Sequence, residues 1–163
     1  HHILNLLNPS SVNTLRIDTL LDAHGRAQVL SGYLRMSLGN HFVDNIGSGG
    51  CMVSVELDTG RLNRYARSDF NYYGVELLTE HPVTGTIFDG FQLPFIEEVK
   101  DLVSRAAELM PGLRIVGWDV AISETGPIIV EGNSDYGIRG NDLAYGGYLA
   151  HPVLKEVLKE ANL

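Results

Sequence analysis

The chain has 163 residues, and 44% of them are hydrophobic, which is enough for one domain with a buried core. Its formal net charge of −8 argues against a nucleic-acid surface, because neutralising phosphates requires clustered Lys and Arg. Cys51 is the only cysteine, so the sequence excludes a disulfide framework and a cysteine-based zinc site.

The first third of the chain predicts an antiparallel meander. Residues 13–21 and 26–36 have the pattern of two strands joined by a four-residue turn. Alternation gives these strands an apolar face, on which we expect Leu30 beside Leu15 and Ile17. The opposite face is predicted to carry the side chains of Thr14, Arg16, Asp18, Ser31, Tyr33 and Arg35. A second hairpin is expected over residues 51–57 and 62–67.

A glycine-rich stretch, Gly47-Ser48-Gly49-Gly50, separates the two hairpins and follows Asp44-Asn45. Such stretches let backbone N–H groups approach an anion closely. The candidate phosphate-binding residues are Asn45, Ser48, Gly49 and Gly50. A flexible loop without a ligand is the alternative interpretation.

Helical patterns follow an irregular stretch over residues 68–92. Pro94 stands at an early position of the first helix, whose apolar residues recur at helical spacing up to Leu109. A last helix is expected over residues 152–161. The predicted fold class is therefore α+β, a mainly antiparallel sheet with flanking helices packed on one side.

Between these helices, residues 117–122 and 127–133 predict a hairpin. A three-residue turn ending at Gly126 would place Ser123 opposite Pro127 and Asp119 opposite Glu131. Asn133 then lies diagonally from Asp119 on the same face. The other face is expected to be apolar and to contain Val116, Trp118, Val120, Ile122, Ile128 and Val130.

Asp119, Glu131 and Asn133 would converge on one face of this hairpin. Two carboxylates and an amide are oxygen ligands of the kind that suit Mg²⁺ or Mn²⁺. Like charges directly opposite each other destabilise a sheet unless something neutralises them, which favours a bound cation. The alternative is an acidic face that is merely solvated.

The chain resembles the ATP-grasp superfamily, and within it the sugar-transfer-associated ATP-grasp family. The resemblance is carried by the segments at residues 11–16, 45–50, 81–85, 117–122 and 126–133. It implies that ATP binds here with Mg²⁺ (or Mn²⁺) held by Asp119, Glu131 and Asn133. It also implies phosphate-binding roles for Arg16 and Arg35, whose planar guanidinium groups suit phosphate oxygens. Arg139 is a candidate for contact with a carboxylate substrate.

The family implies an ATP-dependent carboxylate–amine ligase that works through an acyl phosphate, with a possible link to polysaccharide or sugar-transfer pathways. The alternative is a non-catalytic module that keeps the fold for nucleotide sensing or assembly. No lysine precedes Lys100. We therefore expect residues 1–163 to be a single C-terminal ATP-grasp subdomain that lacks its N-terminal adenine-binding partner. We expect this chain to be inactive alone. We expect a cytoplasmic protein without a membrane span. Its expected substrates are a small carboxylate and an amine, and it is expected to bind no nucleic acid. Self-association is a further expectation.

Overall fold

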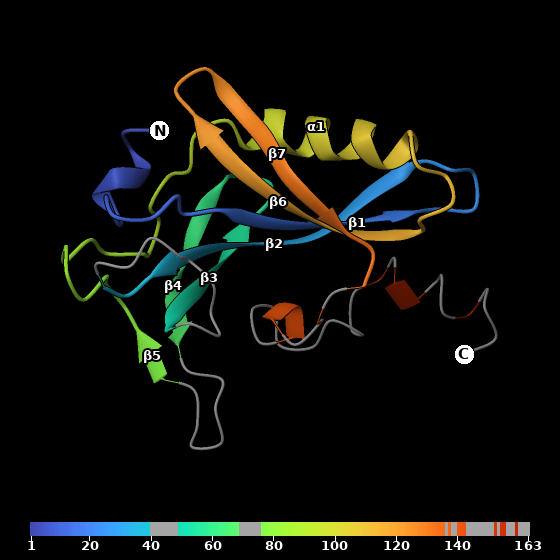
Figure 1. Ribbon diagram of the computed structural model, residues 1–163. Coiled ribbons are helices and arrows are strands. Elements are labelled where there is room, and N and C mark those ends of the chain that lie inside the picture. Colours follow the sequence, from blue (N-terminus) through green and yellow to red (C-terminus); the bar gives the residue numbers. More distant parts are fainter. Residues whose placement is uncertain are drawn as a thin grey trace.

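The centre of the protein is a seven-stranded antiparallel sheet with the strand order β5-β4-β3-β2-β1-β6-β7 (Figure 1). The computed structural model describes residues 1–39, 49–68, 76–135, 137, 140–142, 152, 154–155 and 159. The strands are β1 (Leu15–Leu21), β2 (Ala27–Ser37), β3 (Gly50–Glu56), β4 (Arg61–Ser68), β5 (Glu76–Leu78), β6 (Ile115–Ser123) and β7 (Gly126–Asn133). The helical elements with defined bounds are the 3-10 turn η1 (Leu4–Leu6) and α1 (Ile96–Glu108). Within the described ranges, no helix has the length and hydropathy needed to cross a membrane.

Helix α1 covers one face of the sheet and contacts β1, β2, β6 and β7 (Figure 1). Its buried residues Ile96, Val99, Val103 and Ala107 recur at helical spacing and join the main core cluster. Leu109, which the pattern placed on this apolar stripe, is the C-cap residue and is 82% exposed. The helix therefore ends before its last predicted apolar position.

The opposite face of the sheet is polar but also holds a small apolar cluster of Leu20, Leu30 and Leu154. A β-bulge between Asp18 and Thr19 shifts the β1–β2 register here, so the prediction that Leu30 shares the face of Leu15 is wrong. The extra residue of a bulge changes which side a side chain takes. Leu154 is helical and packs opposite α1, so the expectation of helices on one side only is also wrong.

The β6–β7 hairpin has a shorter turn than predicted. Ser123 pairs with Gly126, which leaves two residues in the loop instead of three. This one-residue shift turns Ile128 and Val130 outward, at 55% and 60% exposure, and directs Ile129 toward the core. A bulge between Asp119 and Val120 then restores the predicted pairing of Asp119 with Glu131.

Trp118 packs directly beneath the part of β7 that carries Glu131 and Asn133. Its indole N–H donates to Thr19 Oγ1 at 2.8 Å, which fixes the ring in the core. Gly132 pairs with Trp118, and a Cβ at this glycine would lie 2.8 Å from the ring. The close approach of β7 to Trp118 therefore requires glycine at this position.

Replacing Gly132 with alanine is expected to lower the free energy of unfolding by about 1–3 kcal/mol, because the new methyl group overpacks the tryptophan ring. Urea unfolding followed by tryptophan fluorescence measures the change. Gly112→Ala is the matched control, since a Cβ there would have nothing within 4 Å. Equal stability of the two variants would contradict this account of the Trp118 contact.

Candidate functional site

The sheet register brings residues from distant parts of the chain into one row. Strand β1 lies between β2 and β6, so Arg16 pairs with Tyr33 on one side and with Asp119 on the other. Asp119 pairs in turn with Glu131 of β7. Directly opposed residues project to the same face. Four strands thus present Tyr33, Arg16, Asp119 and Glu131 side by side on the polar face of the sheet.

Asp119 is held between two arginines. Arg16 Nε donates to Asp119 Oδ1 at 2.6 Å, and Arg16 Nη2 donates to Oδ2 at 3.1 Å. Arg35 Nη2 lies 3.0 Å from the same Oδ2 atom. The three side chains are 5% to 14% exposed, so solvent screens these interactions only weakly. The paired geometry with Arg16 is the two-bond form that makes arginine–carboxylate contacts strong.

These contacts set the protonation state of the cluster. Burial by itself would raise the pKa of Asp119, but the hydrogen bond from Arg16 and the charges of Arg35 and Arg16 outweigh it and hold the pKa below the ordinary value. Burial would lower the pKa of Arg16, and the hydrogen bond with Asp119 reverses that effect and raises it. Burial raises the pKa of Tyr33, which stays a neutral phenol. Asp119 is therefore ionised at neutral pH.

Arg35 is fixed by a second contact, with the residue just before β1. Its Nε and Nη2 atoms donate to Thr14 Oγ1 at 3.1 and 2.7 Å. The structure therefore places both predicted phosphate-binding arginines on the same polar face as Asp119. Arg139, the third candidate, lies outside the described residues.

Glu131 and Asn133 lie on β7, two residues apart and on the same face. The Asn133 amide nitrogen donates to Glu131 Oε1 at 3.1 Å, so the carbonyl oxygen of Asn133 is the atom that can ligate a cation. Glu131 is exposed and Asn133 is half-buried, whereas Asp119 is buried. The three side chains thus range from buried to exposed, so an ion bound among them would be reachable from solvent. Their oxygen atoms are ligands of the kind that suit a hard cation such as Mg²⁺.

Two residues of the glycine-rich stretch, Gly49 and Gly50, are described, and they lie near the end of β2 that follows Arg35. Gly50 is the first residue of β3 and pairs with Ser37, which follows Arg35 by two positions on β2. Gly49 has a φ of +90°, a conformation that glycine adopts readily. Gly50 is therefore part of a strand and not of a loop. Asn45 and Ser48 lie outside the described residues, so their predicted role in phosphate binding stays a prediction.

A second polar cluster, of Asp18, Ser31 and Asn141, lies in the next row of the same face. Ser31 Oγ donates to Asp18 Oδ2 at 2.7 Å, and Asn141 Nδ2 donates to both Asp18 Oδ2 and Ser31 Oγ. Asp18 also pairs with Gly117, which pairs with Asn133. The strand pattern placed Asp18 and Ser31 on this face without a role. Asn141 gave no sequence signal, because it lies between the last predicted strand and the last predicted helix, although the structure makes residues 140–142 helical.

Two other reactive residue types have structural roles. Cys51 is fully buried, and burial raises the pKa of its thiol to about 12, so it is not a nucleophile at neutral pH. His81 is buried with both ring nitrogens in use, one against the Ser37 carbonyl oxygen at 2.8 Å and the other accepting the Val83 N–H at 3.3 Å. Both residues are buried and contribute to packing and hydrogen bonding in the core.

Comparison with curated proteins identifies a partial relative. A protein of Chromohalobacter salexigens named as a probable alpha-L-glutamate ligase is 38% identical over 65 residues. The aligned region is 40% of this chain and 21% of the length of that relative. The chain thus spans a small part of the ligase that it matches.

The family comparison covers almost the whole chain. The profile of the sugar-transfer-associated ATP-grasp family matches residues 1–159. The matched range contains all seven strands of the sheet and every residue of the arginine and carboxylate cluster described above. This protein belongs to the sugar-transfer-associated ATP-grasp family.

Proposed function

We propose that this chain is the Mg·ATP-binding portion of an ATP-dependent carboxylate ligase that works through an acyl phosphate. The observation that carries the proposal is the convergence of Arg16 and Arg35 on Asp119, beside Glu131 and Asn133. These are cationic groups for phosphate and oxygen ligands for Mg²⁺, on one rigid sheet face. Membership of an ATP-grasp family and the partial relative named as a ligase support the same reaction class.

In the structure, the two arginines neutralise Asp119. When Mg·ATP binds, we propose that the guanidinium groups exchange this carboxylate for phosphate oxygens, while Asp119, Glu131 and Asn133 ligate Mg²⁺. Mg²⁺ offsets the negative charge of the phosphates. Each arginine thus keeps an anionic partner throughout, which avoids leaving a buried charge unpaired.

The proposed reaction has two transfers. A carboxylate oxygen of the acyl substrate attacks the γ-phosphorus of ATP, the bond from that phosphorus to the β,γ-bridging oxygen breaks, and ADP leaves. An amine nitrogen then attacks the carbonyl carbon of the acyl phosphate and inorganic phosphate leaves, with loss of a proton from nitrogen. The arginines of the cluster stabilise charge on the transferring phosphoryl group. The buried Cys51 has no step in this scheme.

The proposal assigns the phosphate and metal half of the nucleotide site to this chain and the adenine half to a further segment of a longer protein. The resemblance to ATP-grasp proteins, whose adenine half usually supplies lysines, motivates this division, since no lysine precedes Lys100 in this sequence. The substrates would be a small carboxylate and an amine, and the family name motivates a link to sugar-transfer or polysaccharide pathways.

Glu131→Gln is expected to abolish binding of Mg·ADP without unfolding the protein, because Glu131 is exposed and its loss removes one ligand charge. Thermal unfolding with Mg²⁺ and ADP together should show a saturable rise in melting temperature for the parent and none for the variant. Glu98→Gln, an exposed change on α1 across the sheet, is the matched control and should behave like the parent.

An unchanged Mg·ADP response in Glu131→Gln would contradict the assigned site. If the parent binds the nucleotide but a longer protein that contains the adenine half forms no ADP with any carboxylate and amine, the non-catalytic nucleotide-sensing function would replace the ligase proposal.

Asp119→Asn is expected to destabilise the metal-free protein by about 3–5 kcal/mol at pH 7, because two mostly buried arginines lose their carboxylate. The depressed pKa of Asp119 means that its contribution is fully present above the pKa of an unfolded aspartate and is lost as pH falls through the lower folded value. Urea unfolding from pH 7 down to pH 3 should therefore show a gap between parent and variant that narrows only below about pH 4. A gap that is constant down to pH 3 would contradict the ion-pair account.

A further inference from the structure

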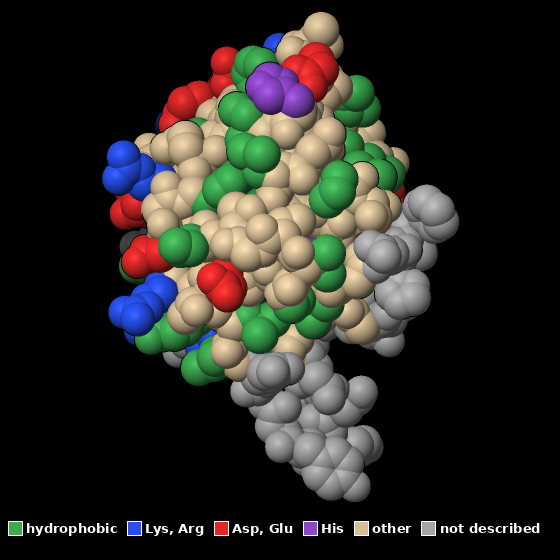
Figure 2. All heavy atoms as spheres, turned by 90° about the vertical axis from the view of Figure 1, so that its left-hand side faces the viewer, with side chains coloured by type: hydrophobic (Ala, Val, Ile, Leu, Met, Phe, Trp, Pro, Cys, Tyr) green, Lys and Arg blue, Asp and Glu red, His purple; other side chains and the backbone are tan. Residues whose placement is uncertain are grey.

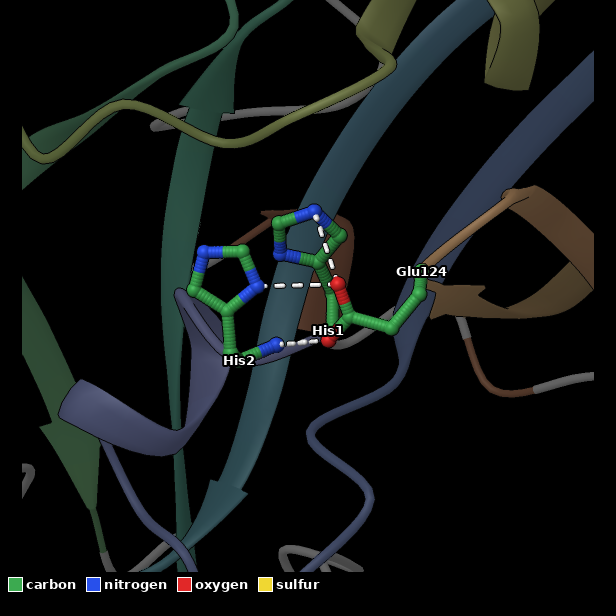
Figure 3. A group of neighbouring side chains, drawn as sticks. All are labelled: His1, His2 and Glu124. Carbon is green, nitrogen blue, oxygen red and sulfur yellow. Dashed lines mark hydrogen bonds and ion pairs between the residues drawn. The ribbon is translucent and has the colours of Figure 1, made fainter.

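The N-terminal residues and the tip of the β6–β7 hairpin meet at a point apart from the arginine and carboxylate cluster. The His1 backbone nitrogen donates to the Ile122 carbonyl oxygen at 2.8 Å. The His2 backbone nitrogen donates to Glu124 Oε1 at 2.6 Å, which orients the carboxylate toward the two histidine rings. Figure 3 shows both rings next to Glu124, although the residues are more than 120 positions apart along the chain.

Three ligand atoms converge there. His2 Nδ1 lies 2.8 Å and His1 Nε2 lies 3.8 Å from Glu124 Oε2, and all three atoms lie within 4.8 Å of one another. Ligands of a tetrahedral Zn²⁺ ion are about 3.3 Å apart, since Zn–N and Zn–O bonds are about 2.0–2.1 Å long. The two separations from the carboxylate oxygen lie on either side of that value. The two imidazole rings are stacked, with centroids 4.4 Å apart and planes 25° from parallel, so the exposed His2 ring must also rotate to turn its nitrogen lone pair toward a shared ion.

The chemistry of these groups suits a borderline divalent cation. Imidazole nitrogens with one carboxylate are ligands that Zn²⁺, Ni²⁺ and Co²⁺ prefer over Mg²⁺. His2 and Glu124 are 72% and 60% exposed, which gives an ion direct access. In Figure 2, a histidine side chain lies at the surface beside acidic side chains.

Metal binding requires a proton shift in both imidazole rings, because His2 Nδ1 carries the proton of its 2.8 Å hydrogen bond to Glu124 Oε2. His1 Nδ1 accepts the Ile3 backbone N–H at 3.2 Å, which places the ring proton on Nε2. An ion bound at Nε2 takes the place of that proton, and the proton on the ring is then carried by Nδ1. The long contact with Ile3 is exchanged for a metal–nitrogen bond.

We propose that His1, His2 and Glu124 form a binding site for Zn²⁺ or a similar transition-metal ion, which links the N-terminal residues to the tip of the β6–β7 hairpin. Three protein ligands leave a fourth tetrahedral position for water. The site is independent of the proposed Mg·ATP site, because it uses nitrogen ligands and none of the residues that contact Asp119.

Titration of the tag-free protein with ZnCl₂ by isothermal calorimetry tests the proposal, and the d–d absorption of Co²⁺ reports the coordination geometry. We expect one saturable site with a tetrahedral Co²⁺ spectrum. Glu124→Gln and His2→Ala should each raise the Kd for Zn²⁺ by about tenfold or more, because each removes one of three ligands. The two substituted side chains, His2 and Glu124, are 72% and 60% exposed, so neither variant should lower the melting temperature when metal is absent.

Three matched variants separate this site from other metal-binding groups. Glu98→Gln and His24→Ala change exposed residues elsewhere, and Glu131→Gln disables the proposed Mg²⁺ site, so all three should retain the Zn²⁺ affinity of the parent. The proposal is overturned if Zn²⁺ does not bind saturably, or if Glu124→Gln and His2→Ala bind it as tightly as the parent does. Loss of binding in Glu131→Gln alone would place the ion at the other site and also overturn it.

Discussion

The ion pair of Asp119 with Arg16 and Arg35 is the interaction on which the polar face of this sheet depends. Moving a carboxylate or a guanidinium out of water costs several kcal/mol unless a partner of opposite charge compensates it. Here the compensation comes from the register, because β1 lies between β2 and β6 and brings the three side chains together. The core beneath, with Trp118 against Gly132, holds these strands at the spacing that the contacts require.

The same balance of charges explains how the cluster could take part in nucleotide chemistry. The cluster of Arg16 and Arg35 with the carboxylates of Asp119 and Glu131 carries no net charge. A metal ion would take over the carboxylates and phosphates would take over the arginines, so each charged group exchanges one partner for another. This exchange is local to side chains, and the sheet itself remains fixed. A preorganised site of this kind stabilises charge without a large reorganisation of the protein.

Alternation along β1 and β2, with a four-residue turn between them, predicted that Arg16, Arg35, Asp18 and Ser31 lie on one side, and this is correct. The turn itself is one residue longer than predicted, because Leu21 pairs with Ala27, and the bulge beside Asp18 compensates for the difference. The pairing of Asp119 with Glu131 was also predicted correctly, although the β6–β7 turn was not. That turn is one residue shorter than expected, and a bulge beside Asp119 compensates for the difference. A bulge depends on packing with neighbouring strands and has no reliable local sequence pattern, which is also why the side chain of Leu30 was misplaced.

Two sets of contacts, those of Asn141 and those of Glu124, could not be predicted from sequence patterns. Asn141 contacts Asp18 and Ser31 from more than 100 residues away, and no periodicity connects them. The meeting of His1 and His2 with Glu124 likewise results from the path of the chain before β1. Contacts of this kind depend on tertiary structure, whereas strand and helix patterns report only on neighbours along the chain.

The most direct test of the Mg·ATP site is paramagnetic broadening of backbone amide signals by Mn²⁺ in the presence of ADP. Bound at the proposed position, Mn²⁺ should broaden the amides of Asp119, Glu131 and Asn133 and leave those of α1, on the other face of the sheet, unaffected. Broadening confined to the surroundings of Glu124, or equal broadening on both faces of the sheet, would contradict the account.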